Sequence, residues 1–370
     1  MSLIEEIDSR RREIRTDSYA MSIGEWISLY EKSELDIHPE FQRFFRWTSV
    51  QKTNLIESII LGIPLPSIFV SQGKNGVWDV VDGLQRLSTV FQLVGILKGV
   101  DDKLVAPLVL NGTKYLPSLN GLQWENKEDG SKSLSSDIQL SIKRSKISVN
   151  IILKESDQNA KYDLFQRLNT GGSELSPQEV RNCLLLMVNK KMFGWLRELS
   201  QYDSFKTVTG LSERPLEESY DVELVLRFMV LYDMDINGLE KIGDVGSFLT
   251  DQITILAQKK KFNYRINEQI FKKTFDALVD SVGENAFKRF SVTKNRHEGG
   301  FLLSQFEVVA LGLAYNINKN TQISNSKIEE TISGIWSSKR YTEWSGYGVN
   351  AARRIPRLIP FGRTIFSTEK

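Results

Sequence analysis

The hydrophobic positions of the chain follow two different periods. Residues 67–72 and 77–81 are short apolar runs with the β-branched character that favours strands. From Leu84 onward, apolar side chains recur every three or four positions, as on one face of a helix. This change of period predicts a strand, a sharp turn and then a helix that continues to about Lys98.

Weaker signals predict the other elements of the N-terminal part. Residues 1–20 carry many charges of both signs, which indicates a charged helix or arm, and residues 23–30 predict a short amphipathic helix. Thr48 followed by Gln51 has the spacing of a capping box and predicts the start of another helix. Residues 73–76 contain two glycines between the two strands and predict a hairpin turn.

The following segment changes character twice. Residues 100–136 are polar and rich in turn-forming residues, so we expect little regular structure there, and such an excursion could serve as a lid. Residues 138–153 are apolar enough to predict one or two strands that complete the N-terminal sheet.

The C-terminal part has a helical period almost throughout. The predicted helices cover residues 180–188, 220–231, 248–256, 267–282, 303–317 and 327–336. The sequence therefore predicts an α+β fold with two domains: a small mixed sheet with helices over residues 1–155, and a mainly helical domain over residues 156–370.

The turn between strand and helix is the best candidate for chemistry. The first N–H groups of a helix lack intrahelical partners, and the helix dipole makes that end partly positive, so an anion binds there readily. Gly83 would let the backbone approach a phosphate, and Arg86 offers a planar fork of donors. Gln85 could contact a base or sugar, and Asp82 could hold a metal ion or orient a water. The alternative is purely structural, since an Asp-Gly pair is a common turn and Asp82 could simply cap the helix.

Two further segments carry weaker candidates. Gln42 and Arg43 stand among aromatic residues between positions 41 and 47, a pattern that suits stacked bases or phosphates but equally an aromatic core with polar residues at its rim. Asn169 precedes a Gly-Gly pair where a helix is predicted to end. Asparagine tolerates the left-handed backbone of such an end, so a structural role is sufficient there.

Composition excludes several classes of protein. The chain is 41% apolar and 25% charged, without an apolar run long enough for a membrane span, and its charged N-terminus is unlike a signal peptide, so we expect a cytoplasmic protein. One cysteine excludes an intramolecular disulfide and a cysteine-based zinc site. Two histidines exclude a histidine-rich nuclease finger, and no Walker A motif is present.

The charge is distributed unevenly. The net charge is +2, yet residues 339–370 contain seven basic and two acidic residues. Arg353, Arg354 and Arg357 form the densest part of this segment, and a basic segment that also carries aromatic residues suits nucleic acid. A solvated surface with a few ion pairs is an equally good explanation.

Four of these segments together resemble a known family. They are Phe41-Gln42-Arg43 with Trp47, residues 55–64, Val81-Asp82-Gly83-Leu84-Gln85-Arg86, and residues 165–172. In this order they are similar to the DGQQR family of ParB/sulfiredoxin-like domains, found in the N-terminal half of GmrSD-type modification-dependent restriction proteins and related phage-defence systems. The resemblance covers residues 20–190 well and the rest more loosely.

The resemblance implies a fold, an activity and a site. It implies a ParB/sulfiredoxin-like sheet and binding and hydrolysis of an NTP, with a divalent ion such as Mg²⁺ as cofactor. By motif match, Asp82 and Arg86 would be catalytic. Gly83, Gln85, Gln42, Arg43 and Asn169 would bind the nucleotide. Leu84 departs from the family motif, which has Gln there. GmrSD-type proteins also carry an HNH nuclease half, for which this chain lacks the histidines, so either a separate nuclease subunit acts or this domain cleaves DNA itself.

Three functions remain open from the sequence. The first is a nucleotide-hydrolysing sensor or regulatory component of a DNA-targeting restriction system. The second is a metal-dependent DNA nuclease acting alone, in which Asp82 would need a second carboxylate such as Asp79 or Glu40. The third is a non-enzymatic, nucleotide-gated DNA-binding switch.

Overall fold

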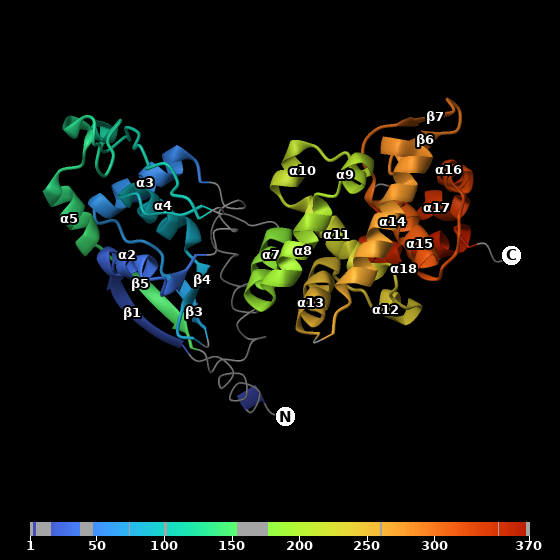
Figure 1. Cartoon of the computed structure of the whole chain (residues 1–370), viewed down its shortest axis with the longest axis horizontal. Helices are drawn as coiled ribbons and strands as arrows, with labels where there is room; N and C mark the ends of the chain where they lie inside the picture. The colour runs from blue at the N-terminus through green and yellow to red at the C-terminus, as the bar shows by residue number, and fades with distance from the viewer. Residues whose placement is uncertain are drawn as a thin grey trace. The chain divides into compact units, whose positions relative to one another are not determined.

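The structure is a computed structural model of the whole chain. It describes residues 3–4, 16–37, 47–73, 75–99, 102–153, 177–259, 261–346 and 348–367. By its internal contacts the chain divides into two compact units, Met1–Glu174 and Leu175–Lys370 (Figure 1). The boundary predicted at residues 155 and 156 lies outside the described residues.

The first unit contains a mixed sheet of five strands in the order β1-β5-β3-β4-β2. The strands are β1 (Thr16–Ser22), β2 (Leu35–Asp36), β3 (Ile68–Gln72), β4 (Trp78–Asp82) and β5 (Lys146–Ile152). β3 pairs with β5 in parallel and with β4 antiparallel, while β1 lies antiparallel beside β5 (Figure 1). Along β5, Ile147, Val149 and Ile151 are buried and alternate with more exposed residues, so one face of the sheet carries the core.

Four helices accompany this sheet in the described part of the first unit. They are α2 (Ile23–Glu31), α3 (Ser49–Ile60), α4 (Leu84–Val94) and α5 (Ser136–Arg144). Thr48 caps α3 and forms the predicted capping box with Gln51, and the predicted hairpin between β3 and β4 is present. The predicted mixed sheet with helices is confirmed.

Three boundaries differ from the sequence prediction. Residues 16–20 belong to strand β1 rather than to a charged helix, because seven pairs with β5 supply the backbone hydrogen bonds. Residues 136–144 form α5 rather than a strand, with only Ile142 fully buried on a helical face. α4 ends at Val94, four residues early, because Gly95 adopts the left-handed conformation that terminates helices.

The excursion at residues 102–136 has little regular structure in its described part, as predicted. It contains only two short 3₁₀ turns, η2 (Pro117–Leu119) and η3 (Gly130–Lys132). It is fastened to α3, since the Asn111 N–H donates to Thr53 Oγ1 at 3.1 Å and the Thr113 hydroxyl donates to Glu57. Its suggested role as a lid stays a prediction.

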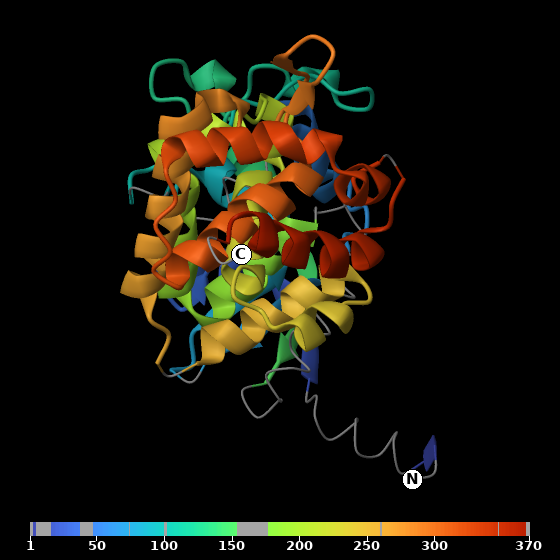
Figure 2. The same cartoon turned by 90° about the vertical axis from the view of Figure 1, so that its right-hand side faces the viewer.

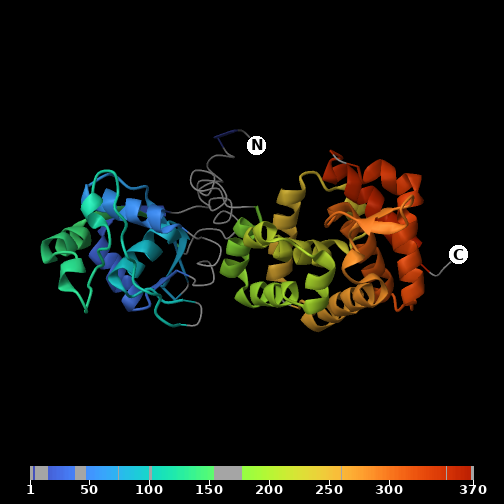
Figure 3. The same cartoon turned by 90° about the horizontal axis from the view of Figure 1, so that it is seen from above.

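The second unit is mainly helical, as predicted, and Figures 2 and 3 draw it almost entirely as coiled ribbons. Its helices are α7 (Pro177–Val188), α8 (Lys190–Ser200), α9 (Asp203–Thr209), α10 (Glu213–Glu217), α11 (Tyr220–Leu231), α12 (Ile236–Glu240), α13 (Val245–Gln258), α14 (Tyr264–Val282), α15 (Leu303–Asn318), α16 (Asn325–Gly334), α17 (Lys339–Trp344) and α18 (Ala351–Ile365). Two 3₁₀ turns, η5 (Gly283–Asn285) and η6 (Ile335–Ser337), and a hairpin of β6 (Arg289–Ser291) with β7 (Arg296–Glu298) complete it.

Fully buried aromatic rings form the core of this unit. Phe228 of α11, Phe271 and Phe275 of α14, and Phe205 of α9 contact one another with centroids 4.5–5.6 Å apart. Such ring contacts add to the area that each ring buries, so these helices are firmly joined.

The C-terminal helix α18 packs unusually closely on α15. A Cβ added to Gly312 of α15 would lie 2.4 Å from the carbonyl carbon of Gly362, so the two backbones touch. This contact also explains a helix that contains Pro356 and Pro360, which remove two backbone donors. Packing along its buried face stabilises α18 despite these prolines.

Candidate functional site

The predicted turn is present and has an irregular strand before it. The pairs Val70–Val80 and Phe69–Asp82 leave one extra residue, Val81, on β4, which is a bulge. Bulges bend a strand and re-aim the residues beside them, and they are frequent next to functional sites. Here the bulge immediately precedes Asp82, the residue that ends the strand.

Gly83 connects the strand to the helix in a conformation that favours glycine. Its φ of +96° lies in the left-handed region, and it is the N-cap residue of α4, without a side-chain cap. A Cβ at this position would lie 2.8 Å from Cγ1 of Ile68, a fully buried side chain. Gly83 is therefore required by the fold itself, whether or not a phosphate approaches it.

Arg86 is buried and holds the chain that precedes β3. Its Nη1 donates to the carbonyl oxygen of Pro66, and its Nη2 donates to the carbonyl oxygen of Ser67 at 3.2 Å. The same Nη2 donates to Asp82 Oδ2 at 2.9 Å. Burial lowers the pKa of the guanidinium, while the Asp82 carboxylate beside it acts in the opposite direction. These contacts make Arg86 a residue that positions the turn.

Asp82 and Gln85 are the partly exposed members of the turn. The Asp82 side chain is 33% exposed. It accepts a hydrogen bond from Arg86, which lies four residues later in the chain. Gln85 Oε1 accepts the N–H of Trp47 at 3.4 Å. The turn is thereby joined to the chain just before α3.

Three predicted residues cannot be placed. Gln42, Arg43 and Asn169 lie outside the described residues, and so does Glu40, one of the suggested second carboxylates. Among the described residues, no group of three or more His, Cys, Asp or Glu side chains is arranged to hold a metal ion.

Sequence reasoning did not single out Lys52, a residue of α3. Its Nζ donates to Gln92 Oε1 of α4 at 2.7 Å, and burial lowers the pKa of its ammonium group. A lysine on an amphipathic helix gives no signal of this kind in the sequence.

The three predicted DNA-binding arginines have different environments on α18. Arg354 donates two hydrogen bonds to the fully buried Glu307 of α15, at 2.7 and 2.9 Å. Arg353 and Arg357 are exposed, and the Arg357 guanidinium carbon lies 3.9 Å from the ring centroid of Trp344. α18 therefore directs one arginine inward and two outward.

Comparison with known protein families gives a match to the N-terminal part of the chain. The family model of the GmrSD restriction endonuclease N-terminal domain matches residues 23–186. Residues 23–186 are a GmrSD N-terminal domain. The match contains the Asp82–Arg86 turn, runs through the first unit, and ends within α7. No curated protein and no solved structure matches the chain, so the likeness of this GmrSD domain to ParB and sulfiredoxin stays a prediction.

The family associates this domain with restriction systems, which act on foreign DNA. In the part of the chain that the structure describes, no helix is both long enough and apolar enough to cross a membrane.

Proposed function

We propose that this chain is a nucleotide-binding and nucleotide-hydrolysing regulatory component of a DNA-targeting restriction system, acting in the cytoplasm. The observation that carries the proposal is the turn from a bulged strand through left-handed Gly83 into α4, inside a GmrSD N-terminal domain. The N-terminus of α4 has no side-chain cap at Gly83, and the geometry of a helix leaves its first N–H groups without intrahelical partners. Phosphate oxygens suit such groups.

The residues of the turn have separate roles in this proposal. Asp82 orients the attacking water or holds a divalent ion, and its partly exposed carboxylate supports that role. Gln85 contacts the nucleotide, with Gln42, Arg43 and Asn169 as further binding residues. Arg86 fixes the orientation of Asp82 through their 2.9 Å hydrogen bond.

Hydrolysis requires little covalent chemistry from the protein. A water oxygen bonds to the terminal phosphorus, the bond to the bridging oxygen breaks, and a nucleoside diphosphate and phosphate result. Positioning and charge stabilisation supply most of the rate. A bound Mg²⁺ would neutralise phosphate charge during this step.

The test is NTP binding and turnover by the full chain, for each NTP in turn, with Asp82→Asn and Arg86→Lys variants. We expect Asp82→Asn to lose turnover while the fold is kept. Arg86→Lys should lose most of the turnover, because one ammonium cannot reach two carbonyls and a carboxylate in the same planar geometry.

Asp102→Asn is the control, since Lys98 and Asp102 form an exposed pair with the same spacing. Absence of nucleotide binding, or unchanged turnover in Asp82→Asn, refutes the proposal. Binding without turnover favours the nucleotide-gated switch instead.

DNA contacts the exposed face of α17 and α18 in this proposal. Arg357 stacks on Trp344, and the Arg340 guanidinium carbon lies 5.5 Å from the ring centroid of Phe361. Arg357 Nη1 also donates to the carbonyl oxygen of Arg353 at 2.7 Å. Arginines held in this way lose less side-chain freedom when they meet a phosphate. Glu343 is the acidic residue of α17.

Salt-dependent binding tests this surface. Replacing Arg353 and Arg357 by Ala should weaken DNA binding and reduce the slope of log affinity against log salt by about 1 for each arginine. Arg214→Ala, which removes one exposed arginine from α10, should leave the affinity and the slope unchanged. Equal effects of the two changes would refute the assignment.

In this proposal a separate nuclease subunit cleaves the DNA, because the two histidines of the chain are too few for a histidine-rich HNH site. Plasmid cleavage by the purified chain with Mg²⁺ or Mn²⁺ would overturn this assignment.

A further inference from the structure

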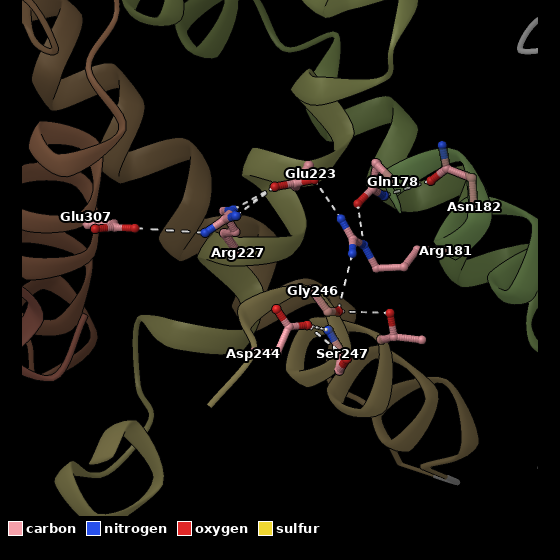
Figure 4. A network of polar contacts seen from close by, with 10 residues as sticks. Gln178, Arg181, Asn182, Glu223, Arg227, Asp244, Gly246, Ser247 and Glu307 are labelled. Atoms are coloured by element: carbon pink, nitrogen blue, oxygen red, sulfur yellow. Dashed lines mark hydrogen bonds and ion pairs between the residues drawn. The ribbon is translucent and has the colours of Figure 1, made fainter. Parts of the chain in front are cut away.

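Buried ion pairs link four helices of the second unit, and Figure 4 shows the part from Arg181 to Glu307. Arg181 of α7 donates from Nη2 to Glu223 Oε2 of α11 at 2.6 Å. The other oxygen of Glu223 accepts from Arg227 Nε at 2.9 Å and Nη2 at 2.8 Å. The Arg181 side chain is only 2% exposed, so these charges interact with little screening by water.

The second half of the series lies between α15 and α18. Glu307 is fully buried and accepts two hydrogen bonds from Arg354. Arg227 Nη1 approaches Glu307 Oε1 to 3.9 Å, which joins the two halves. We call Arg181, Glu223, Arg227, Glu307 and Arg354 the ion-pair chain.

The junction between Arg227 and Glu307 is the weak point of the ion-pair chain. Arg227 Nη1 is buried and makes no hydrogen bond within the described part of the molecule. Three guanidiniums face two carboxylates, so one positive charge is in excess. Arg227 binds Glu223 through Nε and Nη2, and it faces Glu307 through Nη1. Its guanidinium therefore lies between the two carboxylates, and it has to shift toward Glu307 to bind that carboxylate closely.

The two ends of the ion-pair chain lie on helices with different roles. α7 belongs to both parts of the protein: the family match ends within it at residue 186, while its contacts place it in the second unit. Arg181 is fixed there by Gln178 Oε1 at 2.8 Å, and by the carbonyl oxygen of Gly246 at 3.4 Å. At the other end, Arg354 lies on α18 between the exposed Arg353 and Arg357.

We propose that the ion-pair chain is a relay that couples the position of α18 to α7. When Arg354 withdraws from Glu307, the buried carboxylate attracts Arg227, its next cation. Arg227 then leaves Glu223, and Glu223 retains only Arg181 of α7. A regulatory role for the relay rests on the proposed function, because the relay would transmit DNA contact on α18 to α7, the helix that continues the GmrSD domain. The physical coupling between α18 and α7 rests only on the contacts described above.

The decisive experiment measures hydrogen exchange of the α7 amides in the full chain. Arg354→Met leaves Glu307 without its closest partner, and we expect exchange in α7 to change by about 2- to 150-fold, the range of couplings within one ion-pair network. Arg363→Met is the matched control. Arg363 is also buried on α18, but it donates to the carbonyl oxygens of Leu231 and Tyr232, outside the ion-pair chain. This variant should leave α7 unchanged.

A second variant tests whether the unpaired Glu307 carboxylate causes the change in α7, and it distinguishes the relay from simple misfolding. Arg354→Met combined with Glu307→Gln removes both charges of the pair, so nothing attracts Arg227 away from Glu223. Exchange in α7 should then return to the wild-type rate. A change confined to α15 and α18 in the single variant, an equal change in Arg363→Met, or no recovery in the double variant would each overturn the relay.

A ligand-binding experiment distinguishes a failure of the relay from a failure of the proposed function. Added duplex DNA should alter α7 exchange in the wild type but not in Arg227→Met, which lacks the junction. If neither DNA nor nucleotide binds the wild type, the proposed function fails, and the variants above still decide the relay.

Discussion

Gly83→Ala tests how closely the fold determines the candidate site. The substitution adds one methyl group at a φ of +96°, where an L-residue is strained by about 1–2 kcal/mol. The new Cβ would also lie 2.8 Å from Ile68 Cγ1 and 3.2 Å from Arg86 Nη2. Ile68 is fully buried and cannot move freely, so the overlap should cost about a further 1–3 kcal/mol.

Gly95→Ala at the other end of α4 is a matched control. Its φ is +83°, but no atom lies within 4 Å of the added Cβ. It therefore carries the backbone strain without the overlap, and any effect of Ala on the unfolded chain is shared by both variants. The difference between the two isolates the close approach to Ile68 and Arg86.

Native-state hydrogen exchange of β4 and α4 amides is the suitable assay, because a chain of two units need not unfold in one step. We expect protection in the first unit to fall about 5- to 150-fold further in Gly83→Ala than in Gly95→Ala, which corresponds to about 1–3 kcal/mol. Equal losses in the two variants would show that Ile68 and Arg86 do not enclose this glycine.

Two further predictions concern the second unit. Asp244 caps α13, and the Ser247 N–H that it accepts lowers the pKa of its carboxyl group. Its stabilising effect is therefore complete above the ordinary aspartate pKa and is lost as the pH falls through the lower folded value. Urea midpoints of the wild type and Asp244→Asn should thus converge as the pH falls from above the ordinary aspartate pKa through the lower folded value, and a constant gap would contradict this. Gly362→Ala places a Cβ 2.2 Å from the carbonyl oxygen of Val308 and should lower the melting temperature by several degrees, whereas Gly334→Ala, with no atom within 4 Å, should not.

Local signals in the sequence were sufficient where short-range physics decides the structure. The capping box at Thr48, the hairpin glycines and the change of period around Gly83 each act over a few residues, and each is present as predicted. Strand β1 was missed because its stability comes from pairing with β5, more than a hundred residues away. α18 was missed because two prolines argue against a helix that packing on α15 stabilises.

The roles of individual arginines could not be predicted for a related reason. Arg86, Arg354 and Arg357 are all basic residues in promising segments, and their sequence context favours anion contact for each. In the fold, Arg86 binds two carbonyls and Asp82, Arg354 binds Glu307, and only Arg357 is exposed. The partners of a buried guanidinium come from distant parts of the chain, and the sequence around it does not reveal them.

The contrast between Arg354 and Arg357 carries the most information about how α18 could work. One helical turn separates an inward arginine, bound to a fully buried carboxylate, from an outward arginine stacked on Trp344. The backbones of α15 and α18 touch at Gly312 and Gly362, so this part of α18 is held on α15. In the proposed relay, a contact with the exposed Arg353 or Arg357 displaces the Arg354 side chain that lies between them. The pair is therefore suited to convert an external charge interaction into a change among buried charges.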